Sequence, residues 1–373
     1  MRDPHPGPTT RVDLTRRGLR IVATLAAAAA AGAACARLHV PLPWMLGPLF
    51  LTAALGVAGA PLATSSRLRN VGQWVIGMVI GLYFTPEVVA LMPRLAPALL
   101  AGVAWALLLG YAFYRWLLWA SPEMRADRAG AFFAAAIGGA SEMALMAERQ
   151  GGAIDRVAAA HSLRVLMVVA LVPFGFQTLG VMGADPALPA EQAVRPLGLA
   201  LLGASSAAGM ALFHRLRVPN PWVLGSLAAT AALTATEVSL SALPAWASPA
   251  AQVLIGVALG SRFTPDFARA APRWLGAVAI GTVAMIVASA VFAWALARLF
   301  GLHPATVMLG TSPGGIAEMT ITAKVLQLGV PVVAAFHVTR YVGVMVLTGV
   351  LFRWERRRLD AAGSRRGVSG PGA

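Results

Sequence analysis

The chain has 373 residues, of which 58% are hydrophobic and 12% are charged, and its mean hydropathy is +0.71. A soluble domain usually carries about a quarter charged residues, so this composition excludes an ordinary soluble protein and indicates a membrane protein. The net charge of +15 would suggest a nucleic-acid partner in a soluble protein. Here the excess arginines gather largely in two tails without a recognition motif, so we expect no direct nucleic-acid binding.

The N-terminal tail, residues 1–16, is basic and precedes an alanine-rich apolar run. Arg16-Arg17, followed by this run and Cys35, is similar to a twin-arginine or lipoprotein signal that would be removed. A matching run at 199–216 lies in mid-chain, where no signal peptidase acts, so we predict a transmembrane helix instead. Cys35 is the only cysteine, which excludes an intrachain disulfide and a cysteine-based metal site.

Long apolar stretches follow along the whole chain. A spanning helix needs roughly 20 apolar residues, a length reached or nearly reached at 95–119, 157–180, 274–299 and 331–352. The alanine- and leucine-rich blocks lack the ~10-residue alternating segments of a transmembrane β-barrel. The sequence therefore predicts an all-α, polytopic membrane protein.

Two motifs mark the short apolar segments near the start of the chain. Pro41-x-Pro43-Trp44 suits the start of a helix and its anchoring at the membrane interface through the indole. Further on, Gln73 shares a short apolar segment with Gly77 and Gly81. Gln73 is a candidate neutral ligand for a solute or ion, and the alternative is a packing role between helices.

The segment 129–147 carries Gly138-Gly139 in a helical pattern, which predicts a broken or re-entrant helix. Irregular backbone at membrane depth occurs only where protein buries it or where it lines a cavity. Gly138 and Gly139 are therefore candidate binding residues, with close helix packing as the alternative. Glu142 follows, and an acid there usually faces a partner or a cavity. It is a candidate for proton or sodium coupling, or for a fixed ion pair with arginine.

His161 and Arg164 stand three residues apart, which places both side chains on one helix face. An arginine can receive a carboxylate or phosphate through two parallel hydrogen bonds, and a histidine can exchange a proton near neutral pH. One interpretation is an anion site between the two halves of the chain. The other is pairing of each arginine with a nearby glutamate.

All of these blocks recur in the same order in the second half of the chain, which reveals an internal duplication. We predict a basic tail (1–16), a first membrane repeat (17–180), a linker (181–194), a second membrane repeat (195–353) and a second basic tail (354–373). The recurring Pro219-x-Pro221-Trp222 matches the first helix-start motif. The recurring candidate site residues are Gln252, Gly314, Gly315, Glu318, His337 and Arg340.

Matched loops of the two copies carry opposite charge bias. The loop with Arg67 and Arg69 is basic, whereas its counterpart at 245–250 is uncharged. Because cytoplasmic loops collect arginine, the copies are predicted to be inverted. Inversion needs an odd number of crossings per copy, so we predict about ten transmembrane helices plus two broken or re-entrant segments. Twelve full crossings in parallel copies are the alternative.

The repeated motifs Pro-x-Pro-Trp-x-Leu-Gly, Phe-Thr-Pro-Glu/Asp, Gly-Gly-x-x-Glu-Met and His-x-x-Arg resemble those of the bacterial AbrB membrane-protein family, which this duplication defines. The resemblance covers nearly the whole chain. The family carries the labels of transcriptional regulator and of putative ammonia monooxygenase, and it is similar to the superfamily of cation/proton antiporters and anion transporters. It brings no agreed binding residues.

We interpret the chain as a secondary transporter of a small, anionic solute, coupled to protons or sodium. The alternative is a membrane-embedded ligand sensor that influences gene expression through a partner. A monooxygenase would need clustered metal ligands, so we expect no enzyme and no cofactor. The expected partners are the lipid bilayer and a small molecule or ion, and a homodimer stays open. We expect a bacterial inner-membrane location with both termini cytoplasmic.

Overall fold

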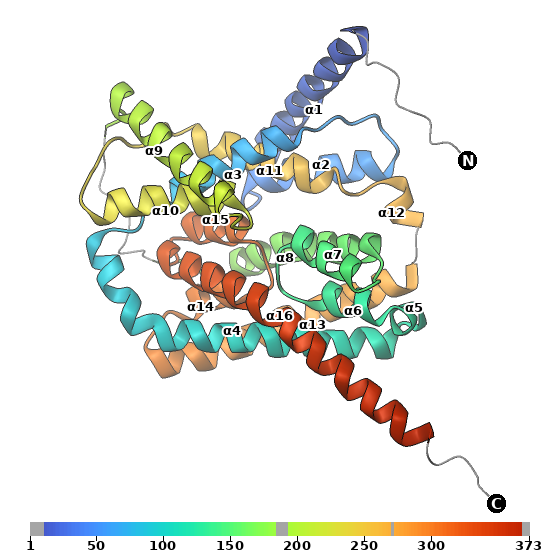
Figure 1. Cartoon of the computed structure of the whole chain (residues 1–373). Coiled ribbons are helices and arrows are strands. Elements are labelled where there is room, and N and C mark those ends of the chain that lie inside the picture. Colours follow the sequence, from blue (N-terminus) through green and yellow to red (C-terminus); the bar gives the residue numbers. More distant parts are fainter. Residues whose placement is uncertain (1–10, 184–192, 270–271, 368–373) are drawn as a thin grey trace, which may run out of the picture. The chain divides into compact units, whose positions relative to one another are not determined.

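The computed structural model describes residues 11–183, 193–269 and 272–367. Every regular element within these ranges is a helix (Figure 1). Six of the described helices, α1, α4, α8, α9, α13 and α16, are long and apolar enough to cross a membrane. The chain is therefore a multi-pass helical membrane protein, and the predicted fold class is confirmed.

The two sequence copies give two matching series of helices. The first copy forms α1 (Arg11–Arg37), α2 (Pro43–Val57), α3 (Ser66–Gly81), α4 (Pro86–Ala120), α5 (Pro122–Ala126), α6 (Arg128–Ala135), α7 (Ala140–Arg149) and α8 (Ile154–Thr178). The second copy forms α9 (Pro196–Arg215), α10 (Pro221–Ala235), α11 (Ala247–Gly260), α12 (Pro265–Arg269), α13 (Pro272–Phe300), α14 (Pro304–Thr311), α15 (Ile316–Leu326) and α16 (Val330–Gly367).

Both predicted helix-start motifs lie where a helix begins. Helix α2 starts at Pro43 and α10 at Pro221, since proline lacks the N–H that a first helical residue leaves unpaired. Both helices, with α3 and α11, have only 14 to 16 residues. They are shorter than the ~20 residues of a perpendicular span, so the predicted total of ten crossings stays a prediction.

Both predicted helix breaks are confirmed. Helix α6 ends at Ala135 and α7 begins at Ala140, with Gly138-Gly139 between them. In the second copy, α14 ends at Thr311 and α15 begins at Ile316, across the matching Pro313-Gly314-Gly315. Each break leaves a C-terminal helix end and an N-terminal helix end close together in the sequence, and these ends carry opposite partial charges.

The chain folds into two compact units, and neither unit corresponds to one sequence copy. Unit 1 comprises residues 1–92, 169–272 and 317–331, and unit 2 comprises residues 93–168, 273–316 and 332–373. Unit 1 therefore collects α1, α2 and α3 with their counterparts α9, α10 and α11. Unit 2 holds the breaks at Gly138-Gly139 and Pro313-Gly314-Gly315.

Helices of the two copies exchange partners inside unit 1. Helix α2 packs on α11, and α3 packs on α10. Matched glycines make this possible: a Cβ on Gly77 would lie 2.6 Å from the Val223 carbonyl oxygen, and a Cβ on Gly256 would lie 2.5 Å from that of Met45. These distances are too short for any side chain. Gly77 and Gly256 therefore join one copy to the other.

Replacing Gly77 with alanine is expected to destabilise the protein, because the added methyl group would meet the backbone of α10. Overpacking of this kind costs about 1–3 kcal/mol. The measurement is the thermal unfolding midpoint in detergent. Gly276→Ala in α13 is the matched control, because a Cβ there meets nothing within 4 Å. Equal midpoints for the two variants would contradict the tight α3–α10 contact.

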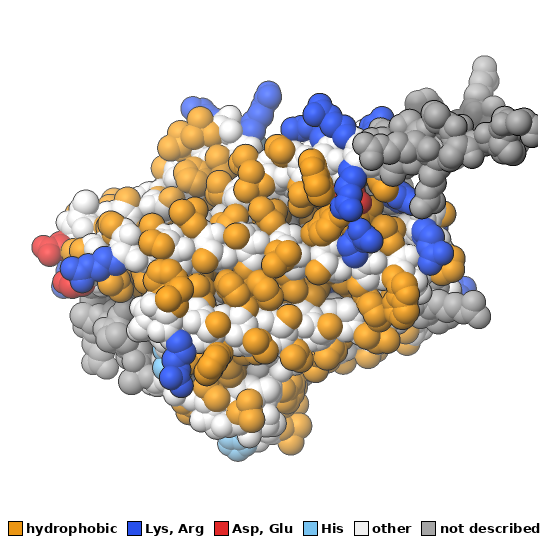
Figure 2. Space-filling view, turned by 90° about the horizontal axis from the view of Figure 1, so that it is seen from below, with side chains coloured by type: hydrophobic (Ala, Val, Ile, Leu, Met, Phe, Trp, Pro, Cys, Tyr) orange, Lys and Arg blue, Asp and Glu red, His pale blue; other side chains and the backbone are white. Residues whose placement is uncertain are grey.

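The surface has the composition expected of a protein in lipid. Large apolar side chains such as Leu100 on α4, Ile280 on α13 and Val346 on α16 are more than half exposed. On the face in Figure 2, hydrophobic side chains are spread over the whole surface, and blue Lys and Arg side chains gather largely near its rim. Apolar exposure on this scale fits contact with lipid tails rather than with water.

Parts of the predicted tails and linker lie outside the described residues. These parts are residues 1–10 and 368–373 of the tails and residues 184–192 of the linker 181–194. The first tail residues that are described, from Arg11, belong to α1, and α16 continues through the second tail to Gly367.

Candidate functional site

Arg164 and His161 on α8 hold the C-terminal end of the broken helix α6. Arg164 donates from Nη1 to the carbonyl oxygen of Ala134 at 3.1 Å and from Nη2 to that of Ala136 at 2.9 Å. His161 Nε2 donates to the carbonyl of Phe133 at 3.0 Å. These carbonyls lack partners within their own helix, so the cation satisfies them and offsets the negative helix end.

The second copy repeats the arrangement with matching residues. Arg340 on α16 donates from Nη1 to the Ser312 carbonyl and from Nη2 to the Gly314 carbonyl, the latter at 2.6 Å. His337 Nε2 donates to the carbonyl of Leu309 at 2.9 Å. Both His–Arg pairs therefore bind the ends of the helices that the sequence predicts to be broken, and all of these residues belong to unit 2.

Each histidine also receives a hydrogen bond from its arginine. Arg164 Nη2 lies 2.9 Å from His161 Nδ1, and Arg340 Nη2 lies 2.9 Å from His337 Nδ1. Because a guanidinium only donates, Nδ1 must accept and Nε2 carries the single ring proton. Both imidazoles are therefore neutral. Protonating either one would break this bond and place a cation against a cation, so the geometry argues against a proton-carrying role.

The two arginines are buried cations. Arg164 is 2% exposed and Arg340 is 6% exposed. They lie within electrostatic range of each other, so their charges repel. Among the described residues of unit 2, no ion pair joins Glu142 to Arg164 or Arg340. The predicted pairing of Glu142 with one of these arginines is therefore wrong. The Nε atoms of both arginines are buried without a hydrogen-bond partner in the described structure.

Glu142 lies in the first turn of α7, three residues after the N-cap Gly139. Its Oε2 atom occupies the space that a Gly139 side chain would need, and Tyr341 of α16 lies on the other side, with Cε2 3.2 Å from that same point. The acid thus faces the positive end of α7. A methyl group at position 139 would displace this carboxylate from its place.

Glu318 has the same position in the first turn of α15 but belongs to unit 1. It is 9% exposed and lies within electrostatic range of Arg262, which in turn is close to Arg69. The sequence did not assign Arg262 and Arg69 to a site. The sequence pattern predicts Arg69 in a loop, as a marker of topology only, whereas the structure places Arg69 in the first turn of α3 and Arg262 in the turn after α11. The counterpart of Arg262 in the first copy is Tyr83, so this cluster breaks the symmetry of the repeat.

The two candidate glutamines lie in unit 1. Gln252 on α11 is buried and donates from Nε2 to the Ser248 hydroxyl at 3.3 Å. Gln73 on α3 is half-buried. The candidate site residues thus divide between the units: both glycine pairs, Glu142 and both His–Arg pairs belong to unit 2, and Gln73, Gln252 and Glu318 belong to unit 1.

Comparison with known proteins assigns the chain to a family. The family model described as "Transition state regulatory protein AbrB" matches residues 44–356, which include both copies of every motif except the first residues of the earliest one. The chain belongs to the AbrB family.

Relatives of similar length agree with this assignment. The AbrB-family chain is 25% identical over 362 residues to "Uncharacterized protein YhjN" of Bacillus subtilis (strain 168), across 88% of this chain and 91% of that protein. It is 26% identical over 316 residues to "Putative regulator AbrB" of Escherichia coli (strain K12), across 83% of this chain and 89% of that protein. The AbrB family therefore accounts for nearly the full length of the chain.

Proposed function

We propose that this AbrB-family protein is a secondary transporter for a small anionic solute, coupled to protons or sodium. The observation that carries the proposal is the pair of broken helices in unit 2, each held by a buried arginine and a neutral histidine. Paired breaks in duplicated membrane proteins supply free backbone groups and helix ends to a bound solute or ion.

The charge balance of unit 2 supports an anion. Its two buried arginines are within range of each other and form no ion pair with Glu142. The carbonyl oxygens that accept from their Nη groups carry only partial charge, so a field of positive sign remains around the breaks. An anion would be attracted to that field, whereas a second cation would be repelled.

The division into two units supports alternating access. Each unit contains matched helices from both copies, and rigid-body movement of one part of a duplicated transporter against another is the usual basis of alternating access. We place the protein in the bacterial cytoplasmic membrane with both termini in the cytoplasm, because its arginine-rich ends favour that side.

Uptake into proteoliposomes tests the proposal. We expect radiolabelled lactate, succinate or citrate to accumulate in vesicles that contain the purified protein when an inward proton or sodium gradient is applied. Protein-free vesicles are the control. Binding of these anions, seen as a raised unfolding midpoint, without accumulation of any under either gradient would contradict transport.

A ligand sensor is the second candidate, and the name "Putative regulator AbrB" of the Escherichia coli relative favours it. A sensor would use the same buried arginines to bind an anion and would pass the signal to a partner protein. The proteoliposome result separates the two candidates, because a sensor binds the anion without moving it.

A further inference from the structure

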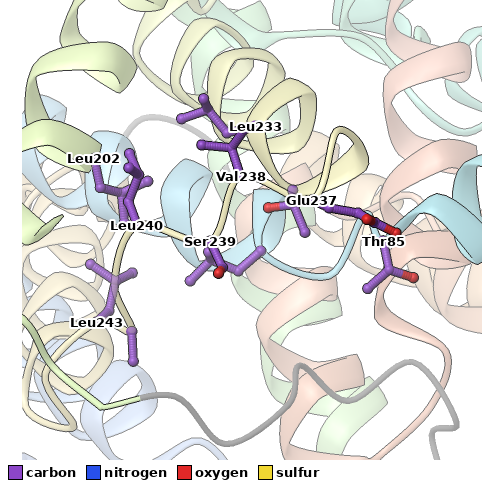
Figure 3. A pocket seen from close by; sticks show the side chains of 11 residues that line it. Thr85, Leu202, Leu233, Glu237, Val238, Ser239, Leu240 and Leu243 are labelled. Carbon is purple, nitrogen blue, oxygen red and sulfur yellow. The ribbon is translucent and has the colours of Figure 1, made fainter.

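Unit 1 contains a pocket that is lined mainly by residues of the second copy. Its volume is ≈ 290 Å³, and it lies where the end of α10 and the segment after it approach α9 and the turn after α3. Five leucines supply most of its apolar wall, and its polar groups are the side chains of Thr85, Thr234, Glu237 and Ser239. Figure 3 shows Leu202, Leu240 and Leu243 toward one end and Glu237 with Thr85 toward the other.

The first copy has a closer backbone contact at the equivalent place. There, Gly56 of α2 lets the carbonyl oxygen of Phe263 lie where a side chain would otherwise be. The residue that matches Gly56 in the second copy is Thr234, whose side chain occupies that space and hydrogen-bonds to the Thr230 carbonyl at 3.0 Å. The turn with Thr85 therefore cannot approach α10 as closely, and a cavity separates them.

Glu237 stands at a backbone position that suits glycine. Its φ angle is 61°, in the left-handed region, and its counterpart in the first copy is Gly59 with φ 79°. A helix commonly ends on such a residue, and glycine adopts the conformation without a steric penalty. The second copy thus has a carboxylate at a pocket position whose backbone conformation favours glycine. A residue in a disfavoured conformation often has a functional role.

The carboxylate of Glu237 has no charged partner in the described part of the chain. The ion pairs there join Arg156 to Asp127 and Arg269 to Asp266, and no hydrogen bond to the Glu237 side chain is present among the described residues. An unpaired acid at the mouth of a leucine-lined pocket, in a protein of net charge +15, is complementary to a cation with an apolar part.

We propose that this pocket binds an amphipathic ammonium group, with the ammonium on Glu237 and the carbon chain against the leucines. A free alkylamine and the ethanolamine headgroup of a lipid both carry this chemistry. The pocket lies within unit 1, whereas the arginine-held helix breaks lie in unit 2, so the failure of either proposal leaves the other untouched.

The test is a titration of the purified full-length protein in dodecyl maltoside with hexylammonium, followed by calorimetry. Hexanol and hexanoate are probes of matched chain length. We expect hexylammonium to bind, hexanol to bind more weakly and hexanoate not to bind. Glu237→Gln is expected to weaken hexylammonium binding by about tenfold or more, because it removes a charge-assisted hydrogen bond.

Two further variants control the result. Glu237→Gly, which restores the first-copy residue, should fold with an unfolding midpoint at least equal to that of the wild type and should lose hexylammonium binding. Asp266→Asn removes an equal charge at an exposed site of unit 1 and should bind as the wild type does. Unchanged binding in Glu237→Gln, or hexanol binding as tightly as hexylammonium, would overturn the proposal.

Added phospholipid identifies the source of the ammonium group. If phosphatidylethanolamine in the micelles competes with hexylammonium and phosphatidylglycerol does not, the pocket holds a lipid headgroup. If neither lipid competes, the ammonium site takes a free amine. Both results retain the site, and the Glu237→Gln variant shows whether any competition occurs in the pocket.

Discussion

Arg340→Ala is expected to lower the free energy of unfolding by at least about 3 kcal/mol, which is a large fraction of the stability of most domains. Arg340 donates to the carbonyls of Ser312 and Gly314 and to the imidazole of His337. Alanine would leave these acceptors buried without partners, at about 1–3 kcal/mol each. It would also remove the positive charge at the negative end of α14.

The measurement is the unfolding midpoint of the purified variant in detergent, together with its yield. Arg94→Ala in α4 is the matched control, because Arg94 is exposed and should be replaceable with little loss. Arg340→Lys should fall between the two, since lysine keeps the charge but lacks the forked donor geometry. A wild-type midpoint for Arg340→Ala would contradict the capping role.

Glu142→Gln and Glu318→Gln are expected to reduce gradient-driven uptake to the level of protein-free liposomes while the protein stays folded. Glutamine keeps the shape and one acceptor oxygen of the side chain but cannot alternate between a neutral and a charged form. Glu142 lies at the N-terminus of α7, and Glu318 has the same position in α15. These are the acids at the helix breaks.

Glu148→Gln is the matched control for this prediction. Glu148 is an exposed acid on the same helix as Glu142, so its substitution changes the charge of α7 away from the break. The control should transport as the wild type does. Undiminished pH-dependent uptake in both Glu142→Gln and Glu318→Gln would show that coupling lies elsewhere.

The sequence was sufficient for the fold class, the duplication and the two breaks. Gly138-Gly139 and Pro313-Gly314-Gly315 identified the breaks because helical backbone cannot pass regularly through a proline and paired glycines. The prolines at 43 and 221 identified helix starts for a similarly local reason. Each of these features depends on residues within one turn of the chain, which is the range that sequence patterns report well.

The partners of the charged residues could not be read from the sequence. Arg164 and Arg340 were predicted to bind an anion or a glutamate, and the structure pairs each with backbone carbonyls. Backbone acceptors are the same at every residue, so no side-chain pattern reveals them. The neutral state of His161 depends on its hydrogen bonds with the Phe133 carbonyl and with Arg164. It could not be predicted from the sequence either.

The pocket at Glu237 depends on a difference between the copies rather than on a motif. The exchange of Gly56 for Thr234 and of Gly59 for Glu237 is visible in the aligned copies, but its consequence depends on the turn that packs there. Sequence comparison draws attention to what the copies share. In the structure, two of the positions at which they differ, Thr234 and Glu237, line the pocket.

The exchange of helices in unit 1 decides how the protein can be assembled. Helix α2 packs on α11, and α3 packs on α10. A polypeptide of only one half would therefore lack the helices that contact Gly77 or Gly256. Two halves produced as separate chains would have to associate in the membrane before either could complete its folding. A single chain that carries both halves supplies them in equal number.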